Sequence, residues 1–351
     1  MQVKSPLAGA VPLIIGRGLS AAICAITPFI LVRILSQEEF GLYKQIFLVF
    51  STLYQVLPFG VLASLYYFIP SAPGKRTGYL VQTELFLGIV TFVAALLLMI
   101  FRYTVASWLG SPVLAEYATE IGIFACVMIL SSAFEMLLVI DGQERYSAVV
   151  TIVSEVAKSL GLVIPLVLLH DLHLMMWTLI GIGLLRVTGL ALYIGKTITA
   201  DERIVIGPET LKSQLSYAIP FGIGGIVTIL LFTLDKYAVS AMFGAAGFAI
   251  YSVGTFQLPI LAIMHHSFAD VAITEMARLR TAGKTSEIVE IWQQTTIALS
   301  TVFFPAFIWL VVMRVALPVA ISITQASAVS ASGLFLTTAM RVLSGEITGW
   351  L

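Results

Sequence analysis

The sequence predicts an all-α polytopic membrane protein. Of its 351 residues, 59% are apolar and 11% are charged, and the mean hydropathy is +1.01. A soluble domain has about 25% charged residues, so this many apolar side chains cannot fit inside one soluble core. The composition excludes a water-soluble enzyme, a nucleic-acid-binding protein and a disordered chain. Long apolar runs, in place of short alternating ones, also argue against a membrane β-barrel.

Nine apolar runs are long enough to cross a bilayer, because a spanning helix needs about 20 residues. They lie at residues 11–32, 45–69, 79–101, 118–140, 147–169, 174–195, 214–234, 245–267 and 293–313, and a tenth, weaker run covers 315–340. The first run follows Lys4, as in a signal peptide, but it is too long for one and contains Arg17. We therefore expect nine or ten transmembrane helices.

The distribution of basic residues predicts that the N-terminus is inside. With that orientation, the inside segments hold ten lysines and arginines and the outside segments hold five. Basic residues favour the cytoplasmic side of a membrane. Over the whole chain the 19 basic and 19 acidic residues cancel, so no net charge points to a polyanionic partner.

Two short segments indicate an internal repeat. Leu35–Tyr43 reads LSQEEFGLY and Phe243–Tyr251 reads FGAAGFAIY, and their endings align at an offset of 208 residues. Each segment follows a predicted helix that ends in a basic residue, Arg33 or Lys236. Six predicted helices precede the second copy, so both copies would face the same way. Transporters are often built from such repeats, with the binding site between the halves.

The repeat divides the chain into two transmembrane lobes. We expect a first six-helix lobe at 1–200, a cytoplasmic linker at 201–213 and a partial second lobe at 214–351. The offset of 208 residues leaves 143 of the 351 residues for the second half, about two helices too few. From Ala316 onward the sequence is rich in small residues, which fits either an ordinary helix or a truncated or frame-shifted end.

Three stretches carry a resemblance to a known family. They are RILSQEEFGLYKQIF, DGQERYSAV and the segment that runs from LKSQLSYAIPFGIGG to LDKYAVSAMFGAAGFAIYSVGTFQLPI. Over about residues 10–313 the chain resembles the polysaccharide flippases, which are the O-antigen and exopolysaccharide exporters of the multidrug/oligosaccharidyl-lipid/polysaccharide exporter superfamily.

The resemblance implies a function and a place in the cell. It implies two six-helix lobes around a central cavity in the bacterial inner membrane. The implied substrate is an oligosaccharide of lipopolysaccharide or exopolysaccharide biosynthesis, linked to undecaprenyl diphosphate and moved from the cytoplasmic to the outer leaflet. The glycan polymerase machinery would be a partner, and no cofactor and no enzymatic activity would be involved.

Six charged residues fall inside predicted spans. Apart from Glu120, two residues from the start of its span, they are Arg17, Glu84, Glu135, Glu155, Lys158 and Arg186. A charge at the bilayer centre costs at least about 2.5–3.5 kcal/mol, so such groups face a protein interior or water. At a rise of about 1.5 Å per residue, all six lie in the inner half or at the centre of the membrane. This placement suits a wet cavity that opens to the cytoplasm.

The three cations are candidates for binding a diphosphate, because phosphate oxygens accept hydrogen bonds from Arg and Lys. They are Arg17, Lys158 and Arg186, and the flippase resemblance favours Arg17. Glu135 and Glu155 are candidates for coupling transport to H⁺ or Na⁺. In the alternative interpretation these charges pair and merely join helices, since Glu155 and Lys158 are three residues apart on one helix face.

The remaining polar groups give weaker signals. Asp235 and Lys236 would end the seventh helix on the outer side, as an interfacial ion pair or a gate. Glu84 lies near the inner interface and could extend to it. The histidines lie at predicted helix ends, and no third ligand stands near HDLH at 170–173, so no metal site is expected.

Four functions remain open at this point. A flippase for lipid-linked oligosaccharides agrees best with three cations in the cavity. An ion-coupled small-molecule antiporter of the same superfamily would need a mainly acidic or aromatic cavity. A membrane enzyme would need a large outer loop or an intramembrane catalytic motif, and the sequence shows neither. A truncated, non-transporting remnant is the fourth alternative.

The predicted topology can be tested by cysteine labelling. With the N-terminus inside, the segment 268–292 is cytoplasmic, so a cysteine in place of Gly283 should react with a membrane-impermeant maleimide only after the cells are opened. Cysteine in place of Ser107, in a predicted outer segment, is the control that should react in intact cells. Reaction at residue 283 in intact cells would contradict this topology.

Overall fold

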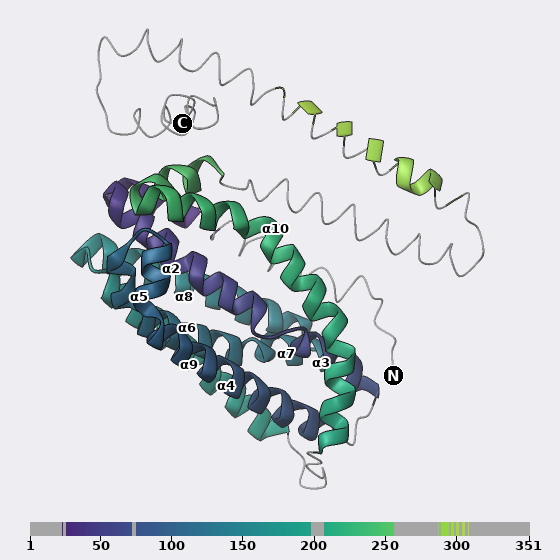
Figure 1. Ribbon diagram of the computed structural model, residues 1–351. Helices are drawn as coiled ribbons and strands as arrows, with labels where there is room; N and C mark the ends of the chain where they lie inside the picture. Colours follow the sequence, from purple (N-terminus) through teal and green to yellow (C-terminus); the bar gives the residue numbers. More distant parts are fainter. Residues whose placement is uncertain are drawn as a thin grey trace, which may run out of the picture. The chain divides into compact units, whose positions relative to one another are not determined.

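The computed structural model describes residues 26–71, 75–197 and 207–255, together with residue 23 and scattered residues between 287 and 308 (Figure 1). The chain divides into two compact units, Met1–Ala249 and Ile250–Leu351, and nearly all described residues belong to the first. Within the described residues the regular structure is entirely helical. This is expected in a bilayer, because a helix satisfies all its backbone hydrogen bonds internally.

Six of the described helices or helix groups are long and apolar enough to cross a membrane. They are Gln37–Pro70, Arg76–Ile100, Pro112–Ile140, Arg145–Leu169, Leu172–Thr197 and Glu209–Gly254. Large apolar side chains lie on the outside of the bundle, as for Phe92 at 67% exposure and Leu185 at 74%. Such a surface faces lipid. The prediction of an all-α polytopic membrane protein is confirmed. Most of the first predicted helix, residues 198–206 of the predicted linker, residues 256–286 with half of the eighth span, and all residues beyond 308 lie outside the described residues.

Helix α2 (Gln37–Val56) begins eight residues before the apolar run expected at 45–69. Ser36 and Glu39 form a capping box, in which the Glu39 carboxylate accepts from the Ser36 N–H at 2.8 Å and the Ser36 hydroxyl accepts from the Glu39 N–H at 3.3 Å. This cap satisfies two backbone N–H groups at the helix start. The chain then turns at 57–60, where Phe59 and Gly60 have positive φ, and continues as α3 (Val61–Ser71).

Helices α4 (Arg76–Ile100), α8 (Glu144–Leu169) and α9 (Leu172–Thr197) agree with the predicted spans to within a few residues. The run at 118–140 instead forms two helices, α6 (Ala118–Ser131) and α7 (Ala133–Ile140), after α5 (Arg102–Trp108) and the short 3-10 helix η2 (Pro112–Tyr117). Ser131 and Ser132 at the break donate to the carbonyls of Met128 and Ile129, a competing bond that bends helices.

Helix α6 occupies the centre of the bundle, where it packs against α4, α9 and α2 (Figure 1). A second packed cluster joins α3, α4, α7 and α9, and its buried members are Leu65, Phe68, Ile69, Tyr79, Leu80, Ala133, Leu137 and Leu190.

Helix α10 (Pro208–Gly254) is one long element with a sharp kink at Gly244, where φ is 65° and ψ is −165°. Only glycine adopts this conformation readily. The kink separates the predicted seventh and eighth spans, and it lies at the start of the run expected at 245–267. The expectation that the seventh helix ends at Asp235 and Lys236 is wrong, because the helix continues to Phe243. The prediction ends the helix too early because it stops at the charged pair Asp235 and Lys236, whereas the apolar stretch resumes after this pair and runs to the kink.

The two copies of the predicted repeat lie against each other. The side-chain amide of Gln37 donates to the Ala246 carbonyl at 3.0 Å. Gly41 touches the backbone of Ala245 so closely that an added Cβ would lie 1.9 Å from its carbonyl oxygen. The offset of 208 residues equates Gln37 with Ala245, so each copy meets the other near its own counterpart. A two-fold relation between the copies would produce such a crossing.

Gly41→Ala should destabilise this crossing. The new methyl group has no space unless α2 and α10 move apart, and overpacking of this kind costs typically 1–3 kcal/mol. Thermal unfolding in detergent should show a lower Tm than that of the wild type. Gly88→Ala on α4 is the matched control, since nothing lies within 4 Å of its Cβ. Equal Tm values for the two variants would contradict the close approach.

Candidate functional site

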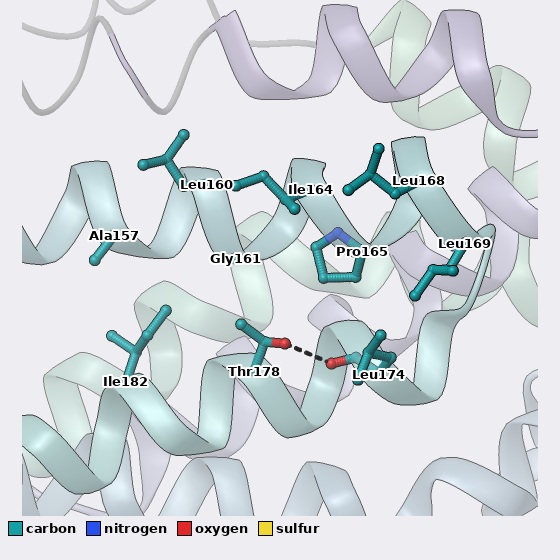
Figure 2. Close-up of a pocket in the computed structure, with 10 residues that line it drawn as sticks. All are labelled: Ala157, Leu160, Gly161, Ile164, Pro165, Leu168, Leu169, Leu174, Thr178 and Ile182. Atoms are coloured by element: carbon teal, nitrogen blue, oxygen red, sulfur yellow. Dashed lines mark hydrogen bonds between the residues drawn. The ribbon is translucent and has the colours of Figure 1, made fainter.

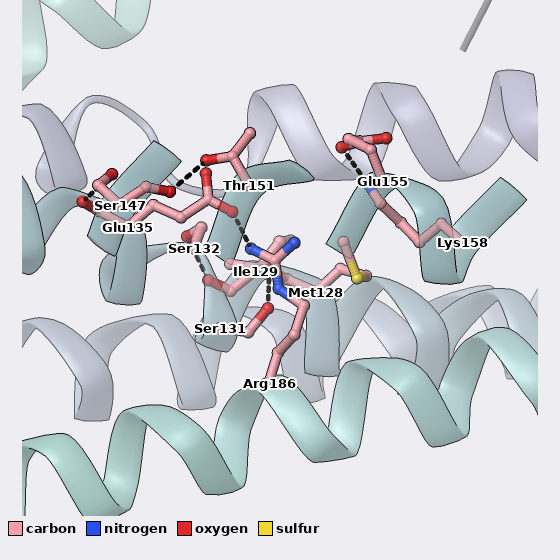
Figure 3. A network of polar contacts seen from close by, with 10 residues as sticks. All are labelled: Met128, Ile129, Ser131, Ser132, Glu135, Ser147, Thr151, Glu155, Lys158 and Arg186. Atoms are coloured by element: carbon pink, nitrogen blue, oxygen red, sulfur yellow. Dashed lines mark hydrogen bonds and ion pairs between the residues drawn. The ribbon is translucent and has the colours of Figure 1, made fainter. Parts of the chain in front are cut away.

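Two ion pairs inside the first unit bring together four of the candidate charges (Figure 3). The Arg186 guanidinium on α9 is 2.9 Å from the Glu135 carboxylate on α7, and these side chains are 10% and 30% exposed. On α8 the Lys158 ammonium is 2.5 Å from the Glu155 carboxylate, with side-chain exposures of 21% and 19%. Pairing lowers the cost of keeping each charge in the membrane.

Hydroxyl groups tie the helices that carry these charges. Ser147 near the start of α8 donates to the backbone carbonyl of Glu135 on α7 at 3.1 Å, and Thr151 donates to the carbonyl of Ser147 (Figure 3). The helix break at Ser132 precedes Glu135 by three residues. Two serines therefore hold the backbone around Glu135: Ser132 at the helix break and Ser147, which bonds to the Glu135 carbonyl.

A cavity of about 210 Å³ lies next to the Lys158–Glu155 pair. Helices α2 and α6 supply its aromatic residues, and α8 and the segment 26–34 supply its polar ones. The lining comprises Thr27, Pro28, Tyr43, Phe47, Phe50, Phe124, Met128, Glu155, Lys158, Ser159, Leu162 and Leu179. The Thr27 hydroxyl donates to that of Ser159 at 3.0 Å, which joins the helical segment 26–34 to α8. The cavity is thus enclosed by this segment, α2, α6, α8 and α9.

Five aromatic side chains form a continuous row along α2, and we refer to them as the aromatic row. They are Phe40, Tyr43, Phe47, Phe50 and Tyr54. Successive ring centroids are 5.8, 4.9, 5.9 and 5.7 Å apart. The spacing of three, four, three and four residues places them on one helix face. The prediction of the site from its charges missed this row, although the spacing is visible in the sequence.

The aromatic row ends beside the charges. Tyr54 lies within electrostatic range of Arg186, Glu135 and Glu155. The two ion pairs, the cavity and the aromatic row therefore belong to one region of the first unit. The sequence brought Lys158 and Glu155 together by their spacing, but it did not predict that Arg186 pairs with Glu135, 51 residues away.

The other predicted site residues lie elsewhere. Arg17 falls outside the described residues. Asp235 and Lys236 lie inside α10, and Lys236 lies within electrostatic range of Lys44 on α2. One carboxylate oxygen of Glu84 is buried and has no hydrogen-bond partner among the described residues. Within the described part of the chain no three potential metal ligands cluster.

Two buried amide networks attach α10 to the other helices, and no pattern in the sequence indicates either of them. Gln214 donates to the hydroxyls of Ser64 and Thr83 at 2.9 and 2.8 Å, and accepts from Gln82 at 3.0 Å. Near the other end of α10, the side-chain amide of Gln45 donates to Ser240 and to the Leu109 carbonyl, each at 2.8 Å. Gln214, Gln45 and Ser240 are fully buried.

A larger, apolar groove of about 390 Å³ lies between α8 and α9 (Figure 2). Leucine and isoleucine side chains from both helices line it beside Gly161 and Pro165. Its one hydroxyl, on Thr178, already donates to the Leu174 carbonyl at 2.7 Å. A groove of this composition offers contacts to hydrocarbon and no polar group for recognition.

The comparison with protein families decides the kind of protein. A family model described as polysaccharide biosynthesis protein matches residues 7–273, which is more than half of the chain. The chain belongs to this family. Membership confirms the resemblance found in the sequence, and with the six helices it indicates a multi-pass membrane protein with a polysaccharide-related substrate. Members of the polysaccharide biosynthesis family are transporters rather than enzymes. No curated protein and no solved structure gave a match.

The Arg186–Glu135 pair should behave as one energetic unit. Removal of one partner leaves the other charge partly buried, which costs about 3–5 kcal/mol for a fully buried pair and less here because Glu135 is 30% exposed. Arg186→Met and Glu135→Gln should each lower Tm in nanodiscs, and the double variant should lose less than the two combined. Additive losses would show that the pair is not coupled.

Proposed function

We propose that this protein is a flippase for undecaprenyl-diphosphate-linked oligosaccharide in the bacterial inner membrane. The observation that carries the proposal is Lys158, a membrane-embedded ammonium group on the wall of a cavity. A cation inside the membrane is costly, so it is rarely found there except at functional sites. A diphosphate is the charged part of such a substrate and would bind this ammonium group. Membership in the polysaccharide biosynthesis family supports this substrate class.

The carboxylates explain how the two cations are stabilised inside the membrane when no substrate is bound. Glu155 holds Lys158 and Glu135 holds Arg186 in the resting pairs. A phosphate oxygen would replace a carboxylate oxygen as the partner of each cation. The released carboxylate, either Glu155, which lines the cavity, or Glu135, would then take up H⁺ or Na⁺ and so couple transport to an ion gradient. Arg17, ten residues before Thr27 of the cavity wall, is proposed as a third ligand of the diphosphate.

Alternating access would use the two amide networks of α10. The cavity must open to one side of the membrane at a time, so contacts between the lobes must break at one end while those at the other end hold. Gln214 and Ser240 lie 26 residues apart on α10, or roughly 39 Å at 1.5 Å per residue. In this proposal the Gln214 network closes the cytoplasmic side, and the Gln45–Ser240 network closes the outer side.

The alternative is an ion-coupled antiporter for small cationic molecules. Aromatic rings and the Glu155 carboxylate on one cavity favour it, because aromatic faces and carboxylates both attract cations. In that case Lys158 would hold Glu155 until the substrate displaced it. The two functions differ in the role of Lys158, which binds substrate in a flippase and is dispensable for substrate contact in an antiporter.

Lys158→Gln should reduce glycan export more than tenfold, because the side chain stays polar but loses the charge that a phosphate needs. Lys158→Arg should keep partial activity. The measurement is surface glycan in a strain without its own flippase, with the amount of membrane-inserted protein checked by immunoblot. Lys196→Gln, an exposed lysine at the end of α9, is the matched control and should export normally. Normal surface glycan with Lys158→Gln would refute the proposed role.

A further inference from the structure

We propose that Phe47 and Phe50 of the aromatic row form a stacking surface for the sugar unit next to the diphosphate. This inference rests on the proposed function and extends it from the lipid headgroup to the glycan. It assigns the lining residues on α8 and those on α2 to two parts of one substrate. Lys158 on α8 would bind the phosphate, and the rings on α2 would bind the first pyranose ring.

The cavity has the two faces that a sugar requires. A pyranose ring presents apolar C–H groups on its flat faces and hydroxyls around its rim. The C–H hydrogens carry a small positive charge and are attracted to the negative face of an aromatic ring. Polar groups that can bond to the hydroxyls come from α8 and the segment 26–34, which bring Thr27, Ser159 and Glu155 to the same cavity as Lys158.

Burial distinguishes the rings that offer most surface to a ligand from those that are nearly covered. Phe40 is 1% exposed and does not line the cavity, and Tyr43 and Phe124, which line it, are only 5% and 2% exposed. Phe47 and Phe50 are half-buried and line the cavity. Phe124 supports them from α6, with its ring stacked on Phe50 at 4.3 Å and edge-on to Phe47 at 6.4 Å. Contact with Phe124 therefore holds the two half-buried rings in place.

The size of the cavity limits what it can hold. At about 210 Å³ it is smaller than the roughly 300–1,000 Å³ of sites for drug-sized ligands. One sugar ring is therefore the part of an oligosaccharide that suits it. Because Lys158 lines the same cavity, this ring would be the one attached to the diphosphate. The surface would thus bind the first sugar and make no contact with the rest of the glycan.

The test compares two lipid probes on the full chain in nanodiscs. The probes are undecaprenyl diphosphate and undecaprenyl diphosphate that carries one N-acetylglucosamine, and their Kd values are measured by native mass spectrometry. Phe47→Leu and Phe50→Leu should each weaken the sugar-bearing probe by about three- to tenfold, the size of one aromatic contact, and leave the bare diphosphate unchanged. Phe50→Tyr keeps the ring face and should bind both probes as the wild type does.

Two further variants distinguish this inference from the function on which it rests. Phe92→Leu on α4, a phenylalanine that is 67% exposed on the outside of the bundle, should change neither Kd. Lys158→Gln should weaken both probes alike. If the Leu variants weaken both probes equally or neither, the stacking surface is wrong while the diphosphate site stands. If the wild type binds neither probe and instead binds tetraphenylphosphonium, the proposed function is wrong and this inference falls with it.

Discussion

The cost of a charge in hydrocarbon is the constraint on which the arrangement of this protein depends. Arg186 and Lys158 are tolerated inside the membrane because Glu135 and Glu155 lie 2.9 and 2.5 Å away. Pairing of Arg186 with Glu135 fixes α9 against α7, and the hydroxyl of Ser147 fixes α7 against α8. The cavity lies between the segment 26–34, α2, α6, α8 and α9, and the Glu155–Lys158 pair forms part of its lining.

Ion pairs and neutral hydrogen bonds hold different helices together. Ion pairs join α7 to α9 and also join α4 to the end of α7, where Arg76 is 2.6 Å from Asp141. Helix α10 is attached through neutral amides, hydroxyls and close backbone approaches. A neutral contact is cheaper to open in a low dielectric than an ion pair. These contacts of α10 therefore suit a moving element.

Within the described ranges the sequence predicted the membrane helices well, because hydropathy and length report what a bilayer requires. Helix ends were less accurate where a local polar bond decides them, as at the Ser36 capping box and the Ser132 break. The Glu155–Lys158 pair was readable because three residues separate its members on one helix. The Arg186–Glu135 pair and the Gln214 network were not, since they join residues 51 and more than 130 positions apart. Such pairs depend on packing, which periodicity does not encode.

Paired cations have a consequence for a transporter that must release its cargo. Under the proposed function, a bare Lys158 would hold a diphosphate tightly, and tight binding would slow release on the far side. With Glu155 at 2.5 Å, binding becomes an exchange of one anion for another on the same ammonium group. The carboxylate that helps the protein to keep a cation in the membrane is then also the group that displaces the phosphate. A single pair on one turn of α8 would serve both the stability of the empty protein and the turnover of the loaded one.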